Sequence, residues 1–460
     1  MPTHNAFVPY PDDCAHCTGP RPSPLLNPSF PLQWLGLRDS RQIAKNKVRK
    51  GPAGLDRGYA VTLVNRESFA PLRAAAAPAE VASSPGTVTS PPFRFYDNRQ
   101  KYLAFVNTCN EKSAVARRVA RELANIAPTP PGMRIFDAGM GDGTVITRLM
   151  RSTHREFPTV PLLVIAKEIS LEDVRLGLEK LPDRFHEHPA TVFVVTNLDY
   201  SEAPTLMPRD IQHAAAFNWQ ELRLTGKSTD EYADQIEKLS ASLAFGWQTR
   251  PSPRTGNPVY VRPSVLVIYR EDHKFLLENV IPRPGRMIEG FDVIMASQPW
   301  RARTSAQFKA QKVLAPLARN LAPGGRMITI QSSGKDPGLE IVQQVWPGEQ
   351  PFKVDRHELL AALKEQLGRE SREYTFSNLP DDKAVFRYDM HTLPSEIADR
   401  IGTSTLMAAW NAAIYVAQIE DERLAVVPDH VYREATQQVL HRHGGLWFND
   451  ETFVVARRRG

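Results

Sequence analysis

The chain has 460 residues, of which 42% are hydrophobic, and a formal net charge of +6. This length is enough for a large buried core and predicts two or three structural units. No stretch approaches the roughly 18 consecutive apolar residues of a membrane span, and the first residues lack the basic start and apolar run of a secretory signal. We therefore expect a globular protein of the cytoplasm with no membrane partner.

Residues 1–92 have the composition of an extension. Prolines crowd positions 9–31, and positions 74–92 are rich in Ala, Ser, Pro and Gly. Such a segment buries too little apolar surface to offset its ordering entropy, so we expect it to be partly disordered. Six Lys and Arg residues between positions 38 and 50 would suit an acidic partner, but a solvated extension is the favoured interpretation.

The cysteines do not indicate a disulfide framework or a complete metal site. Cys14 and Cys17 have the spacing of half a zinc site, and Cys109 is isolated. No second Cys-x-x-Cys pair follows, although His441 and His443 could in principle complete a site. We predict that the protein holds no metal.

The structured part of the chain is expected to span 93–460. A helix with Val115, Val119, Leu123 and Ile126 on one stripe should precede the first strand. That strand runs from Ile135 into Asp137, and the following loop contains glycines at positions 139, 141 and 143. Glycines allow a backbone to turn sharply and to approach a ligand closely. A loop between a buried strand and a helix N-terminus is the usual ligand crevice of open α/β sheets.

Two further apolar runs predict the second and third strands. Residues 161–166 lead into Glu168, whose carboxylate could accept both hydroxyls of a ribose. Residues 191–196 lead into Asn197-Leu198-Asp199-Tyr200. The fourth and fifth strands are expected at 291–296 and 326–330, the last preceded by a helix that stops at Pro323-Gly324-Gly325.

This order of strands, with Asp-x-Gly-x-Gly-x-Gly after the first and Leu-x-Pro-Gly-Gly-Arg before the fifth, resembles the class I S-adenosylmethionine-dependent methyltransferases. The resemblance covers about residues 95–335. It implies a Rossmann-like, mainly parallel seven-stranded sheet with helices on both faces. It also implies that S-adenosylmethionine binds at Asp137, Gly139, Gly141, Gly143 and Glu168, and that Asp199 and Tyr200 contact its adenine, with Asn197-Leu198 as the alternative pair.

Two segments are longer than a simple crossover connection between parallel strands, so we interpret them as insertions. The first, about 205–288, should contain a helix that begins with a Ser228/Glu231 capping box, followed by a β-hairpin formed by 265–269 and 275–280. We interpret it as a lid or a substrate-recognition element. The second, about 335–440, is expected to be mostly helical, with Trp410 in a buried helix. A C-terminal hairpin around Asn449-Asp450-Glu451 would then close the sheet as its sixth and seventh strands.

Ser297-Gln298-Pro299-Trp300, after the fourth strand, is the candidate acceptor site. It is similar to the Asn/Asp/Ser-Pro-Pro-aromatic motif of amino-methyltransferases, except that Gln298 replaces the first proline. The resemblance implies catalytic roles for Ser297 and Trp300, whereas the alternative is an ordinary turn with Trp300 in the pocket wall.

The function predicted from the sequence is methyl transfer from S-adenosylmethionine to nitrogen or oxygen of an acceptor, either a small molecule or a protein. Three alternatives stay open. They are a nucleic-acid methyltransferase that uses the basic N-terminal segment, an aminopropyltransferase of the spermidine synthase type, and a non-catalytic protein that binds the cofactor.

Overall fold

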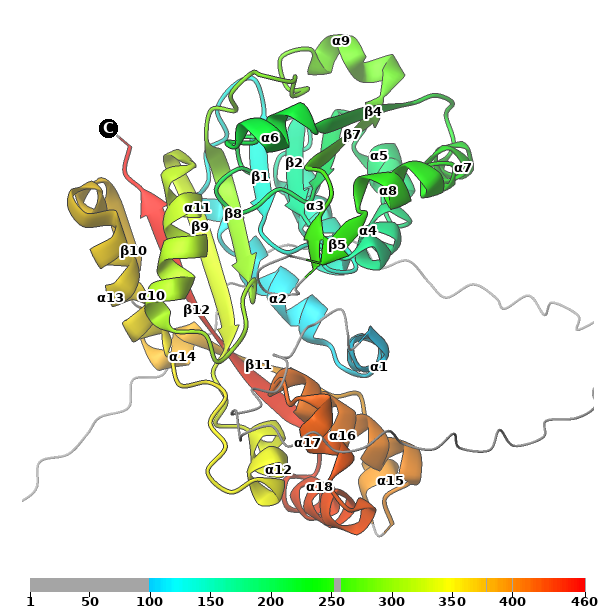
Figure 1. Cartoon of the computed structure of the whole chain (residues 1–460), viewed down its shortest axis with the longest axis vertical. Helices are drawn as coiled ribbons and strands as arrows, with labels where there is room; N and C mark the ends of the chain where they lie inside the picture. The colour runs from blue at the N-terminus through cyan, green and yellow to red at the C-terminus, as the bar shows by residue number, and fades with distance from the viewer. Residues whose placement is uncertain (1–98, 252–257, 378, 399, 460) are drawn as a thin grey trace, which may run out of the picture. The chain divides into compact units, whose positions relative to one another are not determined.

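The computed structural model describes residues 99–459, apart from 252–257, 378 and 399 (Figure 1). The predictions for residues 1–92, including the Cys14–Cys17 pair and the basic segment, lie outside the described residues. Within the described residues, none of the helices combines the length and the apolar character that crossing a membrane requires.

A ten-stranded sheet forms the centre of the described chain, in the order β10-β12-β9-β8-β1-β2-β3-β7-β4, with β11 also paired to β12. Its middle is parallel, as predicted for the first five strands. These are β1 (Met133–Asp137), β2 (Leu162–Lys167), β3 (Thr191–Thr196), β8 (Phe291–Ser297) and β9 (Leu321–Ser332). Their apolar runs are confirmed as strands buried on both faces.

Helices cover both faces of the sheet because successive strand residues point to opposite sides. Phe136 and Ile165 pack on one face against α10 (Ala306–Lys309), α11 (Ala315–Arg319) and α13 (Arg356–Leu367). Ile135 and Val164 pack on the other face against α2 (Glu111–Ala120), α3 (Thr144–Glu156), α4 (Leu171–Leu178) and α5 (Pro182–Glu187). The predicted stripe from Val115 to Ile126 is buried in this second layer. The fold class expected from the sequence is therefore confirmed.

The fifth strand begins earlier than predicted. Helix α11 already ends at Arg319, and β9 starts at Leu321, so Pro323-Gly324-Gly325 lies inside the strand and is not a helix stop. The register between β8 and β9 shifts between Phe291 and Val293. A Cβ on Gly325 would lie 2.3 Å from the Phe291 carbonyl oxygen, so glycine permits this irregularity.

The first insertion widens the sheet. Its strands β4 (Asn218–Leu224) and β7 (Ser264–Arg270) continue the sheet beyond β3, with β7 antiparallel to β3. The predicted hairpin is wrong in its second half, where α9 (Lys274–Leu277) takes the place of a strand. Strand β7 is buried between β3 and β4, so neither of its edges is free for a hairpin partner.

The other elements of this insertion are α6 (Ile211–Ala215), α7 (Thr229–Glu237), α8 (Ser240–Gly246) and a small hairpin of β5 (Thr249–Pro251) and β6 (Pro258–Tyr260). The capping box predicted at the start of α7 is present, with Ser228 and Glu231 hydrogen-bonded reciprocally.

The second insertion contains helices and two further strands of the sheet. Its helices are α12 (Pro337–Val345), α13, α14 (Asp381–Ala384), α15 (Pro394–Ile397), α16 (Thr403–Val416), α17 (Asp421–Ala425) and α18 (Asp429–His443). Trp410 is buried on α16, as expected. Strands β10 (Tyr374–Ser377) and β11 (Val385–Asp389) both pair antiparallel with the C-terminal strand β12 (Trp447–Arg457).

The expected C-terminal hairpin is wrong, because β12 is one continuous strand of 11 residues. Asp450 and Glu451 are buried in its middle, where Glu451 accepts a hydrogen bond from Gln331 and pairs with Arg356. These buried partners allow polar residues inside a strand that the sequence pattern marks as a turn.

Candidate functional site

The carboxyl ends of the parallel strands bring the predicted residues to one edge of the sheet. Asp137 ends β1, Glu168 follows β2, and Ser297 ends β8. The chain runs from β1 through β2 to β3 on one side, whereas β8 and β9 lie on the other side of β1 (Figure 1). The glycine loop therefore stands at the point where the strand order reverses, which is where open α/β sheets bind ligands.

The three loop glycines have different roles. Gly139 is exposed, and a Cβ added to it would meet nothing within 4 Å. Gly141 and Gly143 have positive φ angles of 54° and 76°, which favour glycine. A Cβ on Gly143 would lie 2.6 Å from Gly177 Cα, so Gly143 permits α3 and α4 to pack closely. Only Gly139 thus leaves open space that a ligand could use without any change in the loop.

Asp137 is a fully buried carboxyl group with one unused oxygen. Its Oδ1 accepts a hydrogen bond of 3.1 Å from the Gly139 amide, whereas Oδ2 has no partner among the described residues. Burial raises the pKa of Asp137 to about 7, and the nearby Glu168 carboxylate also raises it. A buried polar atom without a partner is costly, so Oδ2 is placed to accept from a ligand donor.

Glu168 lies beside the glycine loop and contacts it directly. Its Oε2 accepts from the Gly141 amide at 2.7 Å, and its Oε1 accepts from the amides of Ile169 and Ser170. A carboxylate offers about four acceptor positions, and these bonds use three of them. One ribose hydroxyl can therefore bind without change, but the bidentate contact expected from the sequence requires the Gly141 bond to open.

Two residues that the sequence analysis missed cover the glycine loop. The hydroxyl of Tyr102, on α1 (Arg99–Thr108), accepts from the Asp142 amide at 3.1 Å. Lys112, on α2, lies with its Nζ 5.4 Å from the Tyr102 ring centre. The spacing of Tyr102, Phe105 and Cys109, all buried, is a helical stripe that could have revealed α1.

Tyr200 links the loop after β3 to the turn after β8. Its hydroxyl donates to the Pro299 carbonyl oxygen at 3.0 Å, and the Lys167 ammonium lies 4.8 Å from its ring centre. Burial lowers the pKa of Lys167 to about 8. The Tyr200 ring therefore lies at the edge of the sheet where β1 and β2 end. Pro299 binds its hydroxyl, and Lys167 faces its ring.

The structure also separates the two alternative residues after β3. The buried Asn197 side chain binds the backbone of the first insertion, with its amide donating to Gly246 and its oxygen accepting from Ser264. Asp199 is exposed and caps its own turn through Oδ1, which accepts from the Ser201 and Glu202 amides. The Asn197 side chain is therefore used in hydrogen bonds within the fold, whereas Asp199 keeps one carboxylate oxygen that faces solvent.

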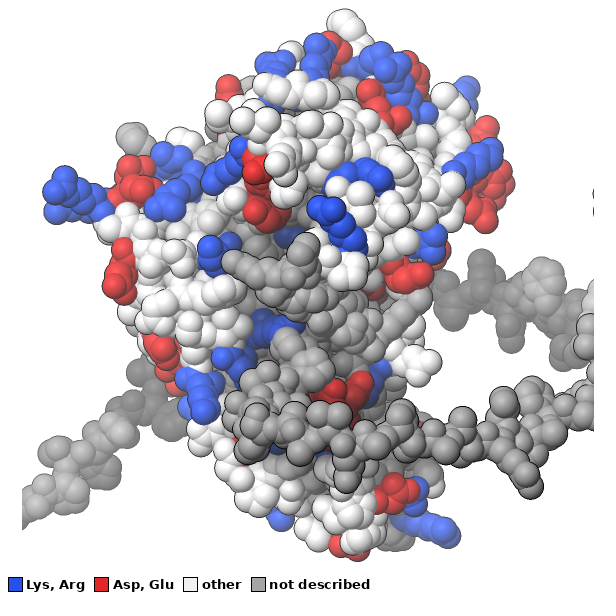
Figure 2. All heavy atoms as spheres, viewed as in Figure 1, with Lys and Arg blue, Asp and Glu red and all other residues white. Residues whose placement is uncertain are grey.

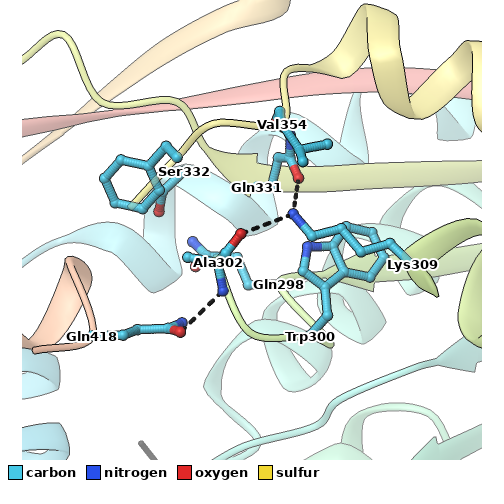
Figure 3. A pocket seen from close by; sticks show the side chains of 9 residues that line it. Gln298, Trp300, Ala302, Lys309, Gln331, Ser332, Val354 and Gln418 are labelled. Atoms are coloured by element: carbon cyan, nitrogen blue, oxygen red, sulfur yellow. Dashed lines mark hydrogen bonds between the residues drawn. The ribbon is translucent and has the colours of Figure 1, made fainter. Parts of the chain in front are cut away.

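The candidate acceptor turn borders a pocket (Figure 3). Gln298 has a φ of 48°, and Trp300 is only 8% exposed, within the core on one face of the sheet. The buried Lys309 of α10 lies with its Nζ 5.4 Å from the Trp300 ring centre. Gln298, Gln331 of β9 and Gln418, which follows α16, also line the pocket. Ser297 is half-buried at the end of β8. The turn is thus both part of the core and the wall of a pocket.

The sheet topology and the glycine loop together decide the fold. Five parallel strands surround the loop, β12 lies antiparallel beside β9, and an acid follows β2. The chain has a Rossmann-like α/β fold with a mainly parallel sheet and helices on both faces. Beyond β9 the sheet continues with β12 and then β10, so the second insertion contributes a strand at this edge of the sheet.

Solved methyltransferase structures resemble the chain over much of its length. A protein from Galdieria sulphuraria described as a sarcosine dimethylglycine methyltransferase is 10% identical, covers 75% of this chain and 85% of its own, and has a TM-score of 0.28. A geranyl diphosphate methyltransferase bound to GPP and sinefungin is 13% identical, covers 75% and 78%, and has a TM-score of 0.29. The rRNA methyltransferase aviRa from Streptomyces viridochromogenes is 16% identical, covers 55% and 78%, and has a TM-score of 0.22.

These identities and TM-scores are too low to carry any inference about the acceptor. No protein-family model and no curated protein matches the chain.

Proposed function

We propose that the protein binds S-adenosylmethionine at the glycine loop and transfers its methyl group to nitrogen or oxygen of an acceptor that is a small molecule or a protein. The observation that carries this proposal is the pairing of an unpartnered, buried Asp137 Oδ2 with the open space at Gly139. A buried acceptor and an unobstructed backbone at the switch point fit a ligand with an amino group and an extended body.

When bound, S-adenosylmethionine supplies a methyl group on a positively charged sulfur. In the transfer, a lone pair of the acceptor forms the new bond to carbon as the carbon–sulfur bond breaks, which leaves a neutral thioether, and the acceptor releases a proton. The protein's contribution to such an in-line displacement is chiefly to position the partners and to exclude water.

The geometry of each residue at the glycine loop indicates which part of the cofactor it would position. We assign the ligand's ammonium to Asp137 and one ribose hydroxyl to the remaining acceptor position of Glu168. Asp199 and the Tyr200 ring take the adenine, since Asn197 is occupied by the insertion. Gly139 provides the close backbone approach, Gly141 provides the positive φ of the loop beneath Tyr102, and Gly143 permits the packing of α3 on α4.

A glycine-to-valine pair tests the cofactor site. Gly139→Val should fold normally, since its Cβ meets nothing within 4 Å, but should reduce the affinity for S-adenosylmethionine at least a hundredfold by filling the ligand's space. Gly402→Val is the matched control, because its Cβ also meets nothing within 4 Å and it lies at the start of α16. Isothermal titration with the cofactor and its demethylated product measures both, and melting temperatures establish that both variants are folded.

Equal affinities for the wild-type protein and a folded Gly139→Val variant would exclude the glycine loop as the cofactor site. Variants at Gly141 or Gly143 are weaker tests, since their positive φ angles and crowded surroundings would perturb the fold itself.

The alternative functions predict different results. A nucleic-acid methyltransferase should bind RNA or DNA with an affinity that falls steeply with salt. On the face in Figure 2, however, Lys and Arg are interspersed with Asp and Glu. Among the described residues, Arg283 pairs with Glu278 and Arg223 pairs with Glu221. An aminopropyltransferase should prefer decarboxylated cofactor, and a non-catalytic protein should bind cofactor without turnover. Adding protein and methyl-labelled cofactor to a lysate, then identifying what becomes labelled, distinguishes these outcomes and reveals the acceptor.

A further inference from the structure

Helix α1 packs on segments that lie far from it in the sequence. Helices α1 and α16 lie beside each other (Figure 1), and the Asn411 side chain of α16 donates to the Lys101 carbonyl oxygen at 3.0 Å. The Phe105 ring contacts aromatic rings of α16, β11 and β12, which are Tyr415, Tyr388 and Phe448. An isolated helix shorter than about 12–15 residues is barely stable in water, and α1 has 10 residues. Its contacts with these segments therefore decide where α1 lies.

The same helix reaches the glycine loop through Tyr102. The Tyr102 hydroxyl accepts from the Asp142 amide at 3.1 Å, and it lies 3.0 Å from the position that a Cβ on Gly141 would take. The Tyr102 ring centre lies 5.9 Å from that of Tyr415 on α16. Tyr102 is therefore in contact with α16 through its ring and with the loop through its hydroxyl. Asp142 is buried, so loss of this acceptor would leave a buried backbone amide without a partner, which is costly.

We propose that Tyr102 is a positioning residue for the cofactor loop and that the second insertion controls it through α16. Because α16 holds α1, it places the Tyr102 hydroxyl on the Asp142 amide and fixes the loop in the conformation that leaves Gly139 open. The second insertion is thereby coupled to the cofactor site, although we assign none of its residues to the ligand.

The effect on cofactor binding rests on the proposed function, whereas the coupling between α16 and the glycine loop does not. Hydrogen exchange of the full-length protein without cofactor, measured on peptides that cover the loop, tests the coupling by itself. Tyr102→Phe keeps the ring but removes the acceptor of the Asp142 amide, and Asn411→Ala removes the bond to Lys101. Each variant should speed exchange in the loop about fivefold, the effect expected of one lost hydrogen bond.

Trp410→Phe is the matched control. Trp410 precedes Asn411 on α16, but its ring stacks on those of Trp346 and Tyr432, with ring centres 5.9 Å and 5.1 Å away. This variant should lower the melting temperature of the protein, because it loses buried packing in the same insertion. It should leave both exchange in the glycine loop and cofactor affinity unchanged, because these contacts do not involve α1.

Calorimetry then measures S-adenosylmethionine binding by the same variants. Tyr102→Phe and Asn411→Ala should each weaken it about fivefold, and the double variant should lose less than the product of the two losses, because both act through one contact. Unchanged loop exchange in either folded variant, or equally faster exchange in Trp410→Phe, would overturn the proposal. If Asn411→Ala does not fold, Asp421→Asn, which removes the charge that pairs with Lys101, takes its place. Failure of the wild-type protein to bind the cofactor would contradict the proposed function, and loop exchange would still decide the coupling.

Discussion

At the scale of single residues, Asp137 should make cofactor binding depend on pH. Burial raises its pKa to about 7, so in the free protein the group is mostly protonated at pH 5.5 and mostly ionised at pH 7.5. A ligand ammonium requires the ionised form. Cofactor affinity should therefore rise by about an order of magnitude between these pH values, and calorimetric titrations at both should show it. Asp137→Asn should bind weakly at both.

The same shift acts in the opposite direction on stability. A carboxyl group whose pKa is raised by folding stabilises the folded protein below its ordinary pKa and loses that contribution as the pH rises through about 7. The free energy of unfolding of the wild-type protein minus that of Asp137→Asn should thus decrease as the pH rises through about 7. A flat difference from pH 5 to 8 in denaturant titrations would contradict the raised pKa.

Tyr200 offers a second prediction at this scale. Tyr200→Phe removes the hydrogen bond to the Pro299 carbonyl but keeps the ring that Lys167 faces and that we assign to the adenine. We expect a loss of about 1 kcal/mol in the free energy of unfolding with nearly unchanged cofactor affinity. Tyr200→Ala removes the ring as well, so it should weaken cofactor binding. Equal cofactor affinities for the two variants would argue against an adenine contact.

At the scale of elements, the first insertion holds the loop after β2. The buried Trp247 indole, just after α8, donates to the Glu168 carbonyl oxygen at 2.9 Å, and the Tyr260 hydroxyl at the end of β6 binds the Ile169 carbonyl. The insertion therefore binds two consecutive backbone carbonyl groups, those of Glu168 and Ile169. This arrangement favours a role in positioning Glu168, while the predicted lid function stays a prediction.

Trp247→Phe tests this coupling. The variant keeps most of the apolar packing but leaves the buried Glu168 carbonyl without its donor, which should cost about 1–3 kcal/mol. Because Glu168 would lose its fixed position, cofactor affinity should fall several-fold even though we assign no ligand contact to Trp247. Trp219→Phe on β4 is a control in the same insertion, since its partly buried ring packs on the Phe217 ring. An equal effect of both variants on affinity would indicate a general loss of stability.

At the scale of the whole molecule, the described residues contain a ten-stranded sheet and most of both insertions. Residues 1–92 lie outside them, and their composition still predicts an extension. A truncated chain that starts at Phe93 should fold and bind the cofactor with an affinity similar to that of the full chain. Circular dichroism and calorimetry check this. Weak binding by a folded truncation would show that the extension contributes to the site.

Local patterns in the sequence predicted the centre of the fold. The apolar runs at β1, β2 and β3 predict strands buried on both faces without any information on which helices pack there. Glycine is favoured in the loop after β1 because part of that loop has positive φ angles. Asp137 ends β1 and Glu168 follows β2, so the parallel pairing of these strands brings both residues to one edge of the sheet.

Contacts between distant parts of the chain decided the rest. The burial of Asp450 and Glu451 inside β12 depends on Gln298, Gln331 and Arg356, none of which is near in sequence. Gly143 packs against Gly177, and Asn197 binds the backbone of the first insertion. Lys309 comes to line one pocket with Trp300 and Gln418 only after three segments pack together. The sequence by itself determined the strands and the glycine loop, because these follow from short-range polarity and backbone geometry. The tertiary structure decided which polar residues are partners, because burial and hydrogen bonding depend on which elements come to lie side by side.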